Sequence, residues 1–323
     1  MSHINRGDSI VVTGGTGFLG HAVVSKLESK GYTNVSSIGS ANYDLRSFDA
    51  VESMYNHRQP DCVIHLAATV GGIGANKENP GRFMYENLVM GTNLIELGRH
   101  EDLKKFIMVG TVCAYPKFTP VPFKEEDIWN GYPEETNAPY GIAKKALMQL
   151  IISYKEQYGF NGINLIPVNM YGPHDNFDPS ISHVIPALIL KFYQAMQVEP
   201  HSPVSIWGTG AASREFLYVD DCAEAIIKAM ECHNDPQPIN LGTGQEITIK
   251  NLAHLVAEKM GYNNHMIFDT TKPDGQPRRC LSVDRATESL GFDAKTSFEE
   301  GIEKTIEWFR NNYDGRYDNN SDI

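Results

Sequence analysis

Tyr140 and Lys144 stand four residues apart in the run YGIAK, a spacing that places both side chains on one face of a helix, about one turn apart. A neighbouring ammonium favours an ionised phenol, so we expect Lys144 to lower the pKa of Tyr140. Such a phenol can exchange a proton with a carbonyl oxygen. Cys113 precedes the pair and His183 follows it, and a thiol with an imidazole indicates proton transfer at carbon as well. The four side chains predict an enzyme that rearranges a ketone-bearing substrate and then reduces it.

A glycine-rich turn near the N-terminus has the spacing of a phosphate-binding loop. Its glycines directly follow the β-branched run 9–12 and precede the helical pattern 21–30. Glycines let backbone N–H groups approach a pyrophosphate, and the positive end of the helix favours its negative charge. The residues expected to bind a dinucleotide here are Gly14, Gly15, Thr16, Gly17, Phe18, Leu19 and Gly20.

The end of the expected second strand bears on which dinucleotide binds. Residues 36–42 read SSIGSAN, and no carboxylate follows until Asp44. Folds that prefer NAD usually place an acid here to bind the ribose hydroxyls. Its absence leaves room for a 2′-phosphate and favours NADP, with NADPH as the reductant. No arginine or lysine stands in this segment to pair with that phosphate.

Short apolar runs alternate with helical patterns in the first half of the chain. The segment 140–158 has helical spacing without an internal proline. The expected strands are 9–12, 34–38, 62–66, 105–109 and 163–167. This alternation predicts an α/β fold of the Rossmann type, with a doubly wound parallel sheet.

The amino-acid composition of the chain changes after Asn169, where proline and glycine become frequent. This change predicts a smaller, discontinuous C-terminal α/β domain that binds the substrate. The run 216–221, FLYVDD, is expected to return to the first sheet. We therefore expect an NADP-binding domain of residues 1–168 plus about 215–242, and a substrate-binding domain of residues 169–214 and 243–323.

The 323 residues carry a net charge of −12, which argues against nucleic-acid or anionic-membrane partners. A local site at a helix N-terminus can still bind an anion. Five scattered cysteines form no CxxC pair or Cys/His cluster, so no metal site is expected. The first residues run almost directly into a strand, which leaves no room for a signal peptide, and no apolar run could span a bilayer. A cytoplasmic enzyme is the simplest expectation.

Several longer segments carry a family resemblance that covers nearly the whole chain. They are VTGGTGFLG, HLAATVGGIGAN, GTVCAYP, NAPYGIAKKA and PVNMYGPHDNFDPSISHVIPA. Together they resemble the extended short-chain dehydrogenase/reductases and, more narrowly, the GDP-L-fucose synthase family of 3,5-epimerase-4-reductases. The Tyr-Lys motif marks only the superfamily, whereas YGPHDNF with SHVIPA is much more specific.

The resemblance implies a role for each candidate catalytic residue. Cys113 would remove protons from the carbons beside a 4-ketone, and His183 would return a proton from the other face. Tyr140 would hydrogen-bond the ketone oxygen and later protonate it. Lys144 would hold the nicotinamide ribose, and the hydroxyl of Thr111 would orient the ketone. One polarising site would serve both stages, since both develop negative charge on the same oxygen.

The resemblance also implies binding residues beyond the glycine loop. The additional cofactor-binding positions are Asp44, Leu45, Leu66, Ala67, Ala68, Val109, Lys144, Pro167, Asn169, Met170 and His183. The implied positions for a GDP-sugar are Lys191, Trp207, Arg214 and Asp274. Lys272, Arg278 and Arg279 either complete the nucleotide pocket or belong to a solvated loop. Lys191 stands where other members have arginine, which weakens bidentate phosphate binding.

The resemblance implies that the substrate is GDP-4-keto-6-deoxy-D-mannose and that it is first epimerised and then reduced. Two alternatives stay open. The same chemistry could act on a GDP-4-keto-6-deoxyheptose, or the protein could be a non-reducing nucleotide-sugar 3,5-epimerase. A 4,6-dehydratase is disfavoured, because Val112 and Cys113 stand where that group needs an Asp-Glu pair. A homodimer is expected, with the helix that carries Tyr140 as a candidate interface.

Overall fold

A large parallel sheet organises the part of the chain that the computed structural model describes, namely residues 3–198, 202–272 and 274–317. Its strand order is β2-β1-β3-β4-β5-β9, and every neighbouring pair is parallel. The strands are β1 (Ile10–Thr13), β2 (Val35–Ile38), β3 (Cys62–His65), β4 (Lys105–Val109), β5 (Gly162–Pro167) and β9 (Ile239–Leu241). Because β2 and β3 flank β1 on opposite sides, the chain reverses its winding direction beside β1.

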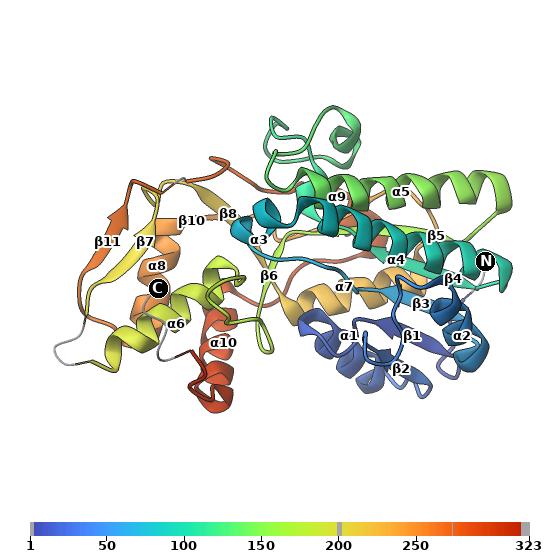
Figure 1. Ribbon diagram of the computed structural model, residues 1–323, viewed down its shortest axis with the longest axis horizontal. Coiled ribbons are helices and arrows are strands. Elements are labelled where there is room, and N and C mark those ends of the chain that lie inside the picture. The colour runs from blue at the N-terminus through green and yellow to red at the C-terminus, as the bar shows by residue number, and fades with distance from the viewer. Residues whose placement is uncertain (1–2, 199–201, 273, 318–323) are drawn as a thin grey trace.

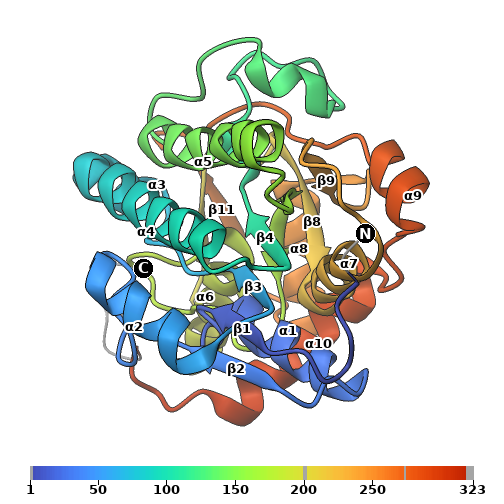
Figure 2. The same ribbon diagram turned by 90° about the vertical axis from the view of Figure 1, so that its right-hand side faces the viewer.

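Helices cover both faces of this sheet, which explains why its central strands β1, β3, β4 and β5 are buried along their whole length rather than on alternate residues. Val12 and Ile64 belong to the core on the side of α1 (Phe18–Ser29) and α7 (Val219–Cys232). Val11 belongs to the core on the opposite side. That side is covered by three helices (Figure 2): α2 (Phe48–Arg58), α4 (Pro80–His100) and α5 (Ala138–Tyr158).

A buried lysine shows how tightly one helix end is held against the sheet. Lys105, the first residue of β4, is 1% exposed. Its ammonium donates to the carbonyl oxygens of Ala229 (3.3 Å), Met230 (2.7 Å) and His233. These carbonyls lie at the C-terminus of α7, the negative end of the helix dipole, so the buried charge of Lys105 has hydrogen-bond partners.

A second group of elements lies beyond the carboxyl ends of the large sheet (Figure 1). A three-stranded sheet, β10-β8-β6, and a two-stranded sheet, β11-β7, pack with helices around a separate apolar core. The strands are β6 (Asn169–Tyr171), β7 (Val204–Trp207), β8 (Ser213–Tyr218), β10 (Glu246–Thr248) and β11 (Met266–Asp269). The helices are α6 (Val184–Met196), α8 (Ile249–Met260) and α10 (Phe298–Asn312).

The Rossmann-type α/β fold is confirmed, and the expected strands and the helix match within a few residues. The expected return at 216–221 is wrong in detail. Residues 213–218 form β8 of the smaller sheet, and α7 begins at Val219 with two acids in its first turn. The strand that does return to the large sheet is β9, at residues 239–241. The expected domain boundaries stay a prediction.

Four shorter elements complete this description: α3 (Ile73–Glu78), α9 (Asp284–Leu290) and two 3-10 turns, η1 (Val112–Ala114) and η2 (Glu125–Trp129). None of the helices in the described ranges combines the length and the apolar character that crossing a membrane requires.

Candidate active site

The glycine loop between β1 and α1 leaves its backbone open at the point where the sheet reverses direction. Gly14 has a φ of 69°, and a Cβ there would lie 2.8 Å from the Ala67 nitrogen, just beyond β3. A Cβ on Gly15 would meet the Ser37 hydroxyl oxygen at 2.5 Å. Gly17 is the N-cap of α1, and no side chain caps the helix there. The first turn of α1, which has no side-chain cap, and the close backbone approach at these glycines fit the pyrophosphate of a dinucleotide.

The acid that follows the second strand is already paired. Both carboxylate oxygens of Asp44 accept from Arg46, at 2.8 Å each, and these bonds lower the pKa of Asp44 to about 2. Arg46 also donates to Glu86 of α4 at 2.9 Å. The next residue, Leu45, is buried in the core beneath. The pairing with Glu86, which is distant in sequence, was not foreseen.

Thr111 and Cys113 lie just after β4, where η1 begins. The Thr111 hydroxyl accepts the Cys113 backbone N–H at 3.2 Å and so caps η1. A Cβ on Gly141 would collide with the carbonyl oxygen of Cys113. Gly141 follows Tyr140 directly, so this close approach brings the first turn of α5 against the residue that carries the thiol.

The Tyr-Lys pair is buried, with Tyr140 7% and Lys144 1% exposed. The Lys144 ammonium donates to the Val109 carbonyl at 3.1 Å and lies 6.0 Å from the centre of the Tyr140 ring. Burial lowers the pKa of Lys144 to about 8. Burial also raises the pKa of Tyr140, the nearby Cys113 adds to this, and hydrogen bonding with Thr111 opposes it.

The expected lowering of the Tyr140 pKa is therefore wrong for the protein without bound ligands. Burial disfavours the phenolate, and Lys144 is not among the groups that shift the Tyr140 pKa. The phenol is neutral at physiological pH, which is the form that donates a proton to a developing oxyanion.

His183 is the N-cap residue of α6, on a loop that the segment after β3 holds in place. The Gly72 N–H donates to the Ile181 carbonyl at 3.2 Å, which ties these two loops together. His183 keeps contact with solvent, and partial burial by the surrounding protein lowers the pKa of its imidazole.

The remaining expected cofactor positions gather at one edge of the large sheet. Leu66, Ala67 and Ala68 follow β3, Val109 ends β4, and Pro167 ends β5. Asn169 and Met170 belong to β6, immediately beyond β5. Since neighbouring parallel strands end at the same edge, these positions lie at the edge of the sheet that also carries the glycine loop, with Leu66 and Ala67 closest to Gly14.

Two of the expected substrate residues, Arg214 and Asp274, meet in the smaller part of the molecule, and Trp207 stands two residues before Thr209, which bonds Asp274. The Asp274 carboxylate accepts from the Thr209 N–H at 2.7 Å and from its hydroxyl at 2.8 Å. Arg214 donates to the Asp274 carbonyl at 3.4 Å. Trp207 is 62% exposed, and the Lys272 ammonium stands 5.3 Å from its ring centre. An exposed indole beside cations offers a stacking surface for a base or a sugar.

Several cations near this surface have no carboxylate partner within the described ranges. Lys191 donates to the Ser205 carbonyl at 3.0 Å, and burial lowers its pKa. Burial and the neighbouring Arg279 lower the pKa of Arg214 to about 10. Arg278, by contrast, forms an ion pair with Glu246. Positive charges without partners suit a diphosphate.

One contact joins the two groups of candidate residues, and sequence reasoning missed it. Arg279 donates a guanidinium N–H to the Cys113 sulfur at 3.8 Å. The run QPRR showed two adjacent cations, but nothing in it indicated that one of them reaches the thiol. The sequence indicated only that both residues are positively charged. Which of the two arginines contacts Cys113 depends on the fold.

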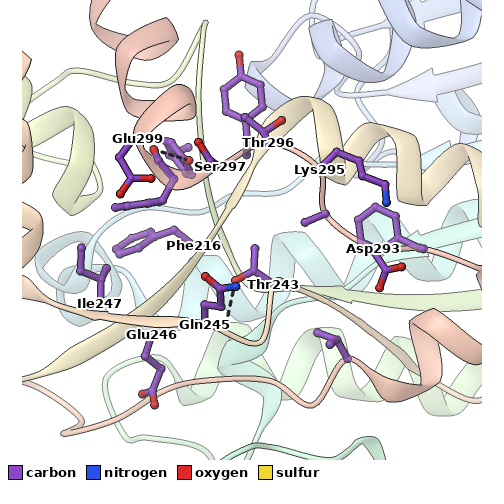
Figure 3. Close-up of a pocket in the computed structure, with 17 residues that line it drawn as sticks. Phe216, Thr243, Gln245, Glu246, Ile247, Asp293, Lys295, Thr296, Ser297 and Glu299 are labelled. Carbon is purple, nitrogen blue, oxygen red and sulfur yellow. Dashed lines mark hydrogen bonds between the residues drawn. The ribbon is translucent and has the colours of Figure 1, made fainter.

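A cavity of about 590 Å³ lies elsewhere, between β8, β10 and the segment that leads into α10 (Figure 3). Its walls include Phe216, Glu246, Lys295 and Glu299. None of the five candidate catalytic residues lines it. Carboxylates in its wall disfavour an anionic diphosphate.

Comparison with known proteins agrees with this fold and site. The model of the NAD dependent epimerase/dehydratase family matches residues 10–242, and the chain belongs to this family. The family expected from the motifs is thereby confirmed.

Individual relatives show which members of this family the chain resembles. The chain is 40% identical to a GDP-L-fucose synthase of Sinorhizobium fredii over 306 residues, covering 95% of this chain and 96% of that protein. A GDP-L-fucose synthetase of Naegleria fowleri bound to NADP superimposes with a TM-score of 0.87 and 31% identity, covering 97% of each chain. A GDP-6-OMe-4-keto-L-xylo-heptose reductase of C. jejuni gives a TM-score of 0.89 at 29% identity, covering 96% of this chain and 99% of that chain.

Proposed function

We propose that the protein is a GDP-L-fucose synthase, which converts GDP-4-keto-6-deoxy-D-mannose to GDP-L-fucose by 3,5-epimerisation and NADPH-dependent 4-reduction. The observation that carries this proposal is the position of the Cys113 thiol beside Tyr140 and Thr111, at the end of β4. A simple ketone reductase needs the phenol but has no use for a thiol at this place. Relatives of that name, similar over almost the full length, support it.

The substrate's diphosphate binds Arg214 and Lys191, and its sugar lies toward Cys113. Arg279 is close to Arg214 and contacts the Cys113 sulfur, so it lies between the diphosphate site and the thiol. Trp207 packs on the base or the sugar.

Epimerisation begins when the Cys113 thiolate takes a proton from a carbon beside the ketone and becomes a thiol. The electron pair moves to the ketone oxygen, where Thr111 and Tyr140 donate hydrogen bonds. His183 returns a proton to the opposite face of the carbon, and the configuration inverts. The neutral phenol that burial maintains is the correct form for holding this oxyanion.

Reduction uses the same oxygen contacts. A bound NADPH would supply the hydride for carbon 4, and Tyr140 would donate its proton to the oxygen of the reduced ketone. Lys144 would hold the ribose, and the glycine loop would hold the pyrophosphate. The segment 36–42, which carries no carboxylate, would accommodate the 2′-phosphate of NADP.

An absorbance assay at the nicotinamide band tests the function, with GDP-4-keto-6-deoxymannose and either NADPH or NADH. We expect NADPH to be oxidised while GDP-L-fucose forms. Solvent deuterium entering carbons 3 and 5 without oxidation would instead identify a non-reducing epimerase. No change in either measurement would contradict the proposed substrate.

A second candidate substrate is a GDP-4-keto-6-deoxyheptose, favoured by the TM-score of 0.89 to the C. jejuni heptose reductase. The contacts to the ketone would be the same for both sugars. Parallel assays with the two substrates distinguish them through kcat/KM.

The functional unit is a homodimer formed through α4 and α5, which lie side by side (Figure 2). Tyr85 of α4 and Tyr158 of α5 are 64% and 49% exposed, which is unusual for side chains of this size. Light scattering after size exclusion should give twice the mass of one chain, and Tyr85→Arg should halve it.

A further inference from the structure

The cavity between β8, β10 and the start of α10 has no role in the proposed reaction (Figure 3). Its volume of about 590 Å³ is within the range of cavities that hold small organic ligands. Residues 292–299, which end in the first turn of α10, close it on one side. Neither Tyr140 nor Lys144 lines it, and Cys113 is also absent from its walls. A ligand in this cavity would therefore be bound apart from the reacting ketone.

Aromatic rings form a firm apolar wall of this cavity. The rings of Phe216 and Phe298 stack with their centres 5.8 Å apart, and the ring of Tyr171 meets both of them edge-on. The Tyr171 hydroxyl donates to the Phe298 carbonyl at 3.4 Å, and a Cβ on Gly301 of α10 would collide with that hydroxyl. Tyr171 and Phe216 are buried, so close packing holds this wall in place before any ligand binds. Its apolar surface suits the C–H face of a ligand.

The rim of the cavity carries hydrogen-bonding side chains of both kinds. Lys295 offers an ammonium, and within residues 3–198, 202–272 and 274–317 this group has no hydrogen-bond or ion-pair partner. Within the same ranges the carboxylate of Glu299, in the first turn of α10, has none either. The Asp293 carboxylate accepts from the Thr287 hydroxyl at 3.2 Å. Neutral side chains add further donors and acceptors, namely Thr243, Gln245, Thr296 and Ser297.

The charges in the wall disfavour strongly charged ligands. Asp293 and Glu299 would repel a phosphate, and Lys295 would repel a polyamine. The charge of Glu246 is already compensated, because this residue forms an ion pair with Arg278. A hydroxyl group, by contrast, is uncharged and can donate and accept at once, which matches a rim that offers both kinds of partner.

We propose that this cavity binds a neutral sugar, either a free monosaccharide or the end residue of an oligosaccharide. The C–H face of the sugar packs on the aromatic wall, while its hydroxyls bond Lys295, Glu299 and Asp293 on the rim. Binding involves no covalent step and no cofactor. The inference does not depend on the reaction proposed for the protein, since none of these side chains takes part in it.

Saturation-transfer difference NMR on the full-length protein tests this site with D-mannose, L-fucose and the disaccharide lactose. Each titration contains excess GDP, which occupies the candidate substrate site. We expect saturable transfer to at least one sugar, with a dissociation constant in the millimolar range. Preference for the monosaccharides or for lactose shows which kind of sugar the cavity accepts.

A paired variant removes one charged donor and one charged acceptor from the rim. Lys295→Met with Glu299→Met should weaken sugar binding about tenfold or more, because two hydrogen bonds are lost. Both residues are exposed, so the fold should persist. Lys124→Met with Glu288→Met is the matched control: these two residues are also exposed, lie outside the cavity and should leave binding unchanged.

Hydrogen exchange gives a second measurement on the unaltered protein, since a bound sugar should slow exchange in residues 292–299. Absence of transfer to all three sugars, unchanged exchange in this segment or parent-like binding by the Lys295→Met, Glu299→Met variant would overturn the inference. Loss of transfer when GDP is added would place the sugar in the candidate substrate site and overturn it as well. Binding of spermidine or pyrophosphate in place of any sugar would contradict the neutral class of ligand.

Discussion

Gly141 lies against the carbonyl oxygen of Cys113, with no room for a side chain between them. The helix that carries the phenol and the turn that carries the thiol are therefore in backbone contact. Gly141→Ala should cost about 1–3 kcal/mol of stability, because the new Cβ must push the turn away. Helix propensity alone would favour alanine by about 1 kcal/mol, so a loss must come from the contact.

Displacement of the turn should also lower kcat/KM by about tenfold or more, since a shift of about 1 Å in a reacting group is costly. Urea unfolding and the NADPH assay measure the two effects. Gly81→Ala in α4 is the control, because no atom lies within 4 Å of its Cβ position. Equal behaviour of the two variants would contradict the role of this contact.

Tyr140→Phe should impair both stages by about 100-fold or more, because both develop charge on the oxygen that the phenol contacts. NADPH oxidation reports the reduction, and solvent deuterium incorporation reports the epimerisation. Tyr132→Phe, at an exposed tyrosine outside α4 and α5, should behave as the parent. Undiminished NADPH turnover in Tyr140→Phe would rule out the proposed role.

Cys113→Ser should impair epimerisation while some direct reduction of the unepimerised ketone survives. The thiol handles protons on carbon, whereas Tyr140 handles the oxygen. Nuclear magnetic resonance of the product distinguishes the resulting stereoisomers. Cys232→Ser, which alters an exposed thiol, is the control. An equal loss of both activities would argue against this division of labour.

The pH dependence of epimerisation should contain a limb that belongs to His183. Its pKa lies below the ordinary value of 6.5 because of partial burial, and only the charged imidazolium can donate. The charged fraction in the free protein falls as pH rises through this lowered pKa, so protonation at carbon should slow as the pH rises through a range below 6.5. His183→Asn should lose the limb, and His254→Asn, in the exposed part of α8, should keep it.

Glu215→Gln should reduce the free energy of unfolding by about 1–3 kcal/mol. The carboxylate accepts the N–H groups of Thr243 and Gly244 on one oxygen and that of Leu281, at 2.7 Å, on the other. An amide NH₂ facing one of these donors cannot accept. Chemical denaturation measures the loss, and Glu288→Gln on the exposed side of α9 should leave stability unchanged.

The larger sheet could be predicted from sequence because its strands are short apolar runs that end at glycine or polar residues. Lys105–Val109 matches the expected strand in full. The prediction that residues 216–221 return to the large sheet was wrong, because four apolar residues followed by two acids fit either a strand or the start of a helix. Asp220 and Asp221, in the first turn of α7, were the overlooked sign of a helix.

The candidate site likewise combines features that the sequence predicts with features that only the folded chain shows. The glycine loop and the Tyr-Lys spacing are local patterns, so they could be found without a structure. The contact between Arg279 and Cys113 joins residues 166 positions apart, and no local pattern encodes it. The pKa of Tyr140 was misjudged because the depth of burial is a property of the folded chain.

The placement of β9 and α7 has a consequence for how the chain is made. An emerging chain that ends near residue 168 holds five strands of the large sheet but lacks both the sixth strand and the helix beside α1. Apolar side chains such as Ile226 and Ile227 of α7, which close one face of that sheet, arrive only later. We therefore expect the nascent protein to bind chaperones until about 240 residues have left the ribosome, and truncation before that point to yield an aggregating fragment.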